Sequence, residues 1–104
     1  MLRPNTTPEE QRFLQGLEQR DAPLFTDIMD IINSTRTRLS RIKTEKTARA
    51  ILQESENQIR VLYPKYKGTK NRLFESDIQK ADAIILRMVH EKIDQIRARI
   101  LSRS

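Results

Sequence analysis

The chain has 104 residues, of which 37% are hydrophobic and 33% charged, and this suffices for one domain with a modest core. It contains no cysteine, which excludes disulfides, thiolate metal sites and cysteine nucleophiles. The formal net charge of +6 favours anionic partners such as nucleic acid, lipid surfaces or acidic protein faces.

The N-terminal residues predict a flexible segment over 1–6 without a secretory signal. No apolar run follows Met1 to Asn5, whereas a signal peptide needs one. The longest uncharged apolar stretch, residues 83–86, is far too short to cross a bilayer. We therefore expect an intracellular protein, in the cytoplasm or in the nucleoid or nucleus, without a transmembrane segment.

Two helices are predicted in the first half of the chain. The first covers 8–20, because Thr7 can cap its N-terminus, Pro8 suits its first position and Glu10 completes a capping box. The second covers 24–43, where residues recur at the spacing of a heptad seam. This seam consists of Phe25, Ile28, Ile32, Thr35, Leu39 and Ile42.

Beyond Ile42 the apolar stripe moves to another face and resumes at Ala48. This shift favours a break near Lys43, with Thr44 capping a third helix over 44–63, although one long helix that changes its buried face remains the alternative. Pro64 should end that helix, and the composition of 64–75 predicts a basic loop.

A long last helix is predicted over 76–102, starting at a second capping box from Ser76 to Gln79. Its length suits an elongated bundle or a helix that pairs with another chain. The fold class is therefore all-α, as one domain over 7–102. We expect an elongated bundle of three or four helices, which self-association could complete.

Net positive charge falls in three segments of the sequence. They comprise Arg36, Arg38, Arg41, Lys43, Lys46 and Arg49; then Lys65, Lys67, Lys70 and Arg72; and then Arg97, Arg99 and Arg103. If the chain turns near Thr44 and the last helix runs antiparallel to the third, the first and last segments meet at one end of the bundle. The loop segment then returns to the opposite end.

These clusters allow two interpretations. Arginine and lysine side chains can neutralise phosphates, and Tyr63 and Tyr66 within the loop segment could stack on bases. Alternatively, a helix end collects solvated cations because its dipole favours them there, and the tyrosines pack over the end of the bundle.

The leading functional hypothesis is a non-enzymatic binding or assembly module that contacts nucleic acid or another polyanion through these arginines and lysines. The alternative is a protein–protein adaptor, chaperone or structural subunit, whose partner or second copy covers a helical seam. That seam is Ile85, Val89, Ile93 and Ile96, and the alternative requires it to be exposed in the monomer. Peripheral membrane binding is a weaker third hypothesis. No catalytic set, metal site, cofactor or small-molecule substrate is predicted.

Overall fold

The protein is an elongated, all-α molecule, as the sequence predicts. The computed structural model describes residues 6–103, with the backbone alone at residue 103, and this range contains no strand. Its Cα extents are 54 × 28 × 18 Å. The helices are α1 (Pro8–Arg20), α2 (Ala22–Leu39), α3 (Glu45–Arg60), the short α4 (Leu62–Tyr66) and α5 (Phe74–Arg103). The predicted flexible segment 1–6 falls outside the described residues except for Thr6.

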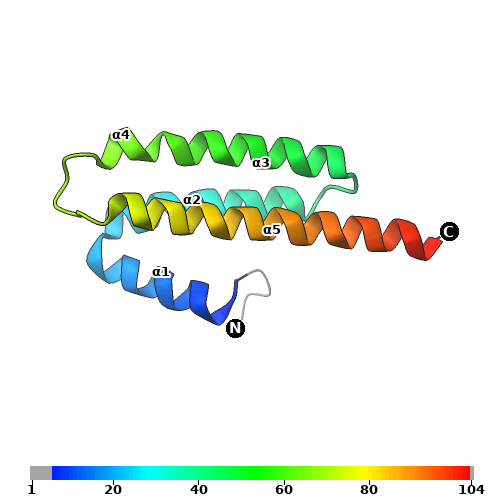
Figure 1. Cartoon of the computed structure of the whole chain (residues 1–104), viewed down its shortest axis with the longest axis horizontal. Helices are drawn as coiled ribbons and strands as arrows, with labels where there is room; N and C mark the ends of the chain where they lie inside the picture. The colour runs from blue at the N-terminus through cyan, green and yellow to red at the C-terminus, as the bar shows by residue number, and fades with distance from the viewer. Residues whose placement is uncertain (1–5, 104) are drawn as a thin grey trace.

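The body of the molecule consists of α2, α3 and α5, which lie side by side along its length (Figure 1). Helices α2 and α3 form an antiparallel hairpin, and α5 packs against both. Helix α4 continues the direction of α3, and α1 folds back along α2. The loop between α4 and α5 lies at one end of the rod and the C-terminal turns of α5 at the other, where they project beyond the α2–α3 turn (Figure 1).

Local hydrogen bonds fix both ends of α1. Thr7 Oγ1 accepts from the backbone N–H of Glu10 at 3.1 Å, and Glu10 Oε1 accepts from the backbone N–H of Thr7 at 2.9 Å, which makes the predicted capping box. Asp21 ends α1 and also caps α2, because its Oδ1 accepts from the backbone N–H of Leu24. Helix α2 begins at Ala22, two residues before the predicted start, since Pro23 is accommodated in its first turn.

The chain turns between α2 and α3. Helix α2 ends at Leu39, four residues before the predicted end, because the backbone N–H of Arg41 bonds to the carbonyl of Arg38 and tightens the last turn. Thr44 is the N-cap of α3, and its Oγ1 accepts from the backbone N–H of Thr47 at 3.2 Å.

Pro64 does not end the third helix, although the sequence predicts that it does. The predicted helix ends at residue 63, whereas α3 ends at Arg60 and Pro64 lies inside α4. A proline cannot donate to the carbonyl four residues earlier, so a continuous helix would lose one bond and clash at Arg60. The interruption at Val61 restarts the helix and places Pro64 in a first turn, where its missing N–H has no helical partner to lose. The predicted loop is correspondingly shorter.

Helix α5 also differs from its predicted start. It begins at Phe74, so Ser76 lies within the first turn and is not the N-cap. The backbone N–H of Leu73 instead donates to Asn71 Oδ1 at 2.9 Å, and that of Asp77 bonds to the carbonyl of Leu73. The entry to α5 is therefore set by the preceding turn.

The proposed partner-helix seam is part of the chain's own core. Ile85 and Val89 are 0% exposed, Ile93 is 3% exposed and Ile96 is 5% exposed. Helices α2 and α3 cover this face of α5. The condition for a partner-covered seam, which was exposure in the monomer, is thus not met by these four residues.

Two hydroxyl groups are buried between α2 and α3. Thr35 and Ser55 are each 1% exposed, and their oxygens lie 2.6 Å apart. Because Thr35 Oγ1 donates to the carbonyl of Ile31 at 2.8 Å, its one proton is used and Ser55 must donate to Thr35. An otherwise apolar interface therefore contains one polar pair that favours a single register.

The Thr35–Ser55 pair makes a stability prediction. Thr35→Val should lower the free energy of unfolding by about 1 to 3 kcal/mol, because the buried Ser55 hydroxyl loses its partner. The double variant T35V/S55A should recover to within about 1 kcal/mol of the wild type, since no unpaired group remains. Urea unfolding followed by circular dichroism measures the free energy of unfolding of both variants. A double variant that is less stable than T35V would contradict the assigned hydrogen bond between Ser55 and Thr35.

Candidate polyanion-binding surface

Two distant segments of positive charge converge at one end of the rod. Because α5 runs antiparallel to α3, its C-terminal part lies beside the α2–α3 turn (Figure 1), and Arg97 Nη2 is 2.9 Å from Glu45 Oε2. We call this surface the basic end. It comprises Arg36, Arg38, Arg41, Lys43, Lys46, Arg49, Arg97 and Arg99.

Acidic side chains engage part of the basic end. Arg38 pairs with Glu54 at 2.7 Å. Glu45 accepts from both Arg49, at 2.6 Å, and Arg97, at 2.9 Å. Arg36, nearby on α2, donates to Asn33 Oδ1.

The other four cations of the basic end are exposed and make no ion pair with a residue of the described range. They are Arg41, Lys43, Lys46 and Arg99. Arg41 and Lys43 lie on the α2–α3 turn, Lys46 lies in the first turn of α3, and Arg99 lies on the projecting part of α5. Three backbone segments thus present unneutralised charge in one region of the surface.

Glu45 joins two of these segments. Hydrogen bonds from Arg97, and then from Arg49, lower the pKa of Glu45 from 4.5 to about 2. The carboxylate consequently stays ionised at every pH where the protein is normally handled. Since one negative charge meets two positive ones, the trio retains a net positive charge.

The loop segment lies at the end of the rod opposite the basic end, and two of its residues bind α2. Lys65 Nζ pairs with Asp27 at 2.8 Å, and the Tyr66 hydroxyl donates to the same carboxylate oxygen at 2.5 Å. Burial, together with the hydrogen bond to Asp27, raises the pKa of Tyr66. Burial would raise the pKa of Asp27, but the bonds from Lys65 and Tyr66 outweigh it and lower that pKa.

The predicted stacking of bases on tyrosine finds no support in this geometry. Tyr66 is only 6% exposed, and Tyr63 is partly buried against the core. The remaining cations of the loop segment, Lys67, Lys70 and Arg72, are exposed and have no ion-pair partner among residues 6–103. We call these three the loop cluster.

The loop cluster is carried on an anchored loop. Asn71 Nδ2 donates to Asp21 at 3.0 Å and to Asp77 at 3.1 Å. Asp77 is 2% exposed and also accepts two hydrogen bonds from Arg20, at 3.1 and 3.3 Å. Gly68, with a φ of 87°, makes the turn that an L-residue would strain. Asn71 therefore points inward while its neighbours stay in solvent.

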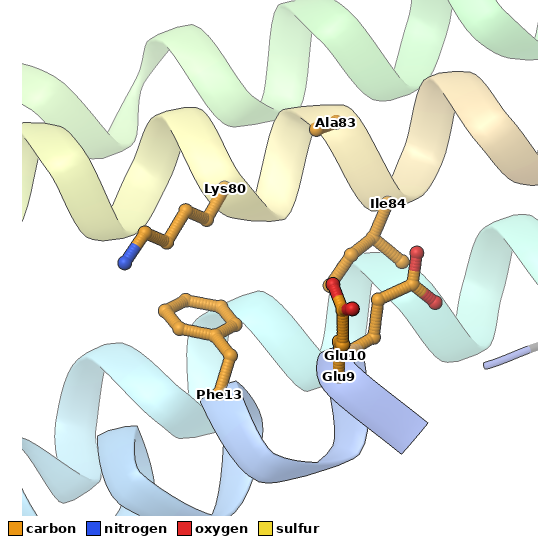
Figure 2. A pocket seen from close by; sticks show the side chains of 6 residues that line it. All are labelled: Glu9, Glu10, Phe13, Lys80, Ala83 and Ile84. Atoms are coloured by element: carbon orange, nitrogen blue, oxygen red, sulfur yellow. The ribbon is translucent and has the colours of Figure 1, made fainter. Parts of the chain in front are cut away.

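A cleft of about 350 Å³ lies between α1 and α5 (Figure 2). It is lined by Glu9, Glu10, Phe13, Lys80, Ala83 and Ile84. Its polar groups are largely engaged, because Lys80 Nζ lies 5.5 Å from the centre of the Phe13 ring and Glu10 binds Arg87 at 2.7 Å. Nothing in its lining resembles a catalytic arrangement.

Residues 6–103 contain neither a candidate metal site nor a candidate membrane-spanning helix. No three histidine, cysteine, aspartate or glutamate side chains are grouped so that they could hold a metal ion. Within the same range, no helix combines the length and apolar character needed to cross a bilayer.

The chain matches no protein-family model, and neither the curated proteins nor the solved structures contain a significant match to it.

Sequence reasoning identified the cations but missed their acidic partners. An acidic residue at position 45 is expected simply because it follows the N-cap Thr44, so its bonds to Arg97, 52 residues away, have no local signal. Asp77 is similar, because the sequence presents it as part of a capping box. Only the antiparallel register of the helices brings either carboxylate to its arginine.

The Glu45 bridge predicts a measurable titration. Arg97→Gln should raise the pKa of Glu45 from about 2 towards 4.5, and Arg49→Gln should raise it less, because Arg97 is the stronger donor. Carboxyl-carbon NMR shifts recorded against pH give the values. Since the folded-state pKa is lowered, the stability contributed by this bridge is complete above pH 4.5 and is lost as pH falls towards 2. An unchanged pKa in R97Q would show that the bridge is absent in solution.

Proposed function

We propose that this protein is a non-enzymatic module that binds nucleic acid through its basic end. The observation that carries the proposal is the convergence of segments 35–49 and 96–103 at one end of the rod, with four exposed cations lacking an ion pair within the described range. Helix-dipole effects explain cations at the end of one helix, but Lys46 lies in the first turn of α3, where the dipole disfavours a positive charge.

Binding would act through the phosphate backbone. Arginine and lysine side chains that neutralise phosphates release condensed counterions, which supplies affinity without reading the sequence. The ion pairs of Arg38 and of Arg49 hold those guanidinium groups in place, so less side-chain entropy is lost on contact. Helices α2, α3 and α5 provide a rigid base for the surface.

The proposal is tested by fluorescence anisotropy with a labelled duplex and a labelled single strand. A variant with Arg41, Lys43, Lys46 and Arg99 changed to glutamine should lose affinity at low salt, because its four phosphate contacts are gone. The slope of log K against log salt, measured from about 50 to 200 mM, should become shallower by about 0.9 for each contact removed.

A matched control removes the same amount of charge elsewhere. Changing Arg12, Arg60, Lys80 and Lys92 to glutamine also lowers the net charge by four, but these residues belong to neither the basic end nor the loop segment. The control should keep the wild-type salt slope to within about one unit. Equal losses in both variants would show that total charge, and not the basic end, determines binding. Wild-type protein that fails to bind at low salt would overturn the proposal.

A further inference from the structure

Positive charge is concentrated in segments at both ends of the rod. Segments 35–49 and 96–102, at the basic end, carry eight positive charges and one negative charge. Segment 65–74, at the opposite end, carries four positive charges and none negative. Outside these segments, residues 6–34, 50–64 and 75–95 carry six positive and thirteen negative charges, and three of these carboxylates, Asp21, Asp27 and Asp77, lie beside the loop segment.

Two cations outside these segments, Arg20 and Arg87, are matched with carboxylates. Arg20 binds Asp77 in two places, and Arg87 binds both Glu10 and Glu91. Carboxylates such as Glu9, Glu18 and Asp30 are in contrast exposed. A polyanion that approaches the middle of the rod therefore meets net repulsion, and the two positive ends do not merge into one continuous track.

The two ends are far enough apart to act independently. From Lys46 to Lys67 the chain runs almost entirely through α3 and α4, and 22 residues at 1.5 Å each span about 33 Å. The Debye length at physiological ionic strength is about 8 Å, so each cluster attracts phosphates without sensing the other.

The loop cluster is built to stay in place. The loop is fixed by Asn71, which binds Asp21 and Asp77, and by Thr69 Oγ1, which donates to the carbonyl of Tyr66. Lys67, Lys70 and Arg72 contribute nothing to these anchors and remain exposed. An ordered loop with three outward cations loses less entropy on binding phosphates than a disordered one.

From these observations we infer that one copy of the chain bridges two nucleic-acid segments, one held at the basic end and the other at the loop cluster. This inference rests on the proposed function, since the basic end must bind nucleic acid for a bridge to form. The loop cluster supplies the second, weaker phosphate site, because it offers three unpaired cations against four.

A co-capture experiment tests the bridge. One duplex is fixed to beads, a second duplex carries a fluorophore, and the fluorescence retained after addition of protein measures bridging. The variant K67Q/K70Q/R72Q should retain at least about tenfold less of the second duplex than the wild type, because three phosphate contacts at one end are lost. Its anisotropy affinity for a single duplex should stay within about threefold, since the basic end is intact.

The matched control is R12Q/R60Q/K80Q, which removes three cations that belong to neither the basic end nor the loop cluster and should bridge to within about twofold of the wild type. Circular dichroism shows whether each variant is folded, and light scattering gives its oligomeric state.

If the loop variant bridges as well as the wild type, the inference is overturned, because self-association of proteins that each bind at one end would then explain co-capture. Wild-type protein that binds a duplex by anisotropy but never retains a second one overturns the bridge and leaves the proposed function standing. A wild type that binds no duplex at low salt overturns both.

Discussion

The buried carboxylate of Asp77 determines how the first and last helices and the loop between α4 and α5 fit together. It accepts from Arg20 at the end of α1 and from Asn71 in the loop, and Asn71 also binds Asp21 at the start of α2. A carboxylate that is 2% exposed must be satisfied in this way, because an unpaired buried charge would be strongly destabilising. The direction of α1, the start of α5 and the conformation of the basic loop are consequently one linked arrangement.

The positions of the carboxylates also determine which cations are paired and which remain exposed. Where carboxylates are available they engage the cations that join helices, as in the pairs of Arg20 and Arg87. Several of the cations left over, among them Arg41, Lys70 and Arg99, lie at the turns and near the end of α5, where packing does not require them. Surface ion pairs contribute little to stability, so the arrangement of charge is better explained by what it leaves exposed than by the pairs it makes.

The sequence predicts those parts of this structure that depend on neighbours in the chain. The capping box at Thr7 and the N-cap at Thr44 are read from a few adjacent residues, and the structure contains both. The end of α3 could not be read in this way, because a proline is tolerated in a first turn and the chain restarts its helix at Leu62. At the candidate surface, the clusters of cations can be recognised in the sequence. That Glu45 pairs with Arg97 cannot, because only the antiparallel register of α3 and α5 brings the two residues together. The sequence likewise could not show that Ile85 is buried within the monomer, because an apolar stripe does not reveal whether the helices that pack against it belong to the same chain or to a partner.

Helix α5 passes beyond its neighbours, and its last turns differ in kind from the rest of it. Ile100 and Leu101 are 62% and 74% exposed, so burial of apolar surface contributes little to helix formation there. Their order is governed by the helix–coil equilibrium, because little tertiary packing stabilises these turns. An anion held by Arg99 would shift that equilibrium towards helix, and part of its binding energy would be consumed in ordering the backbone. If Arg99 binds an anion as proposed, ligand affinity and local helicity are thermodynamically linked at the tip of α5.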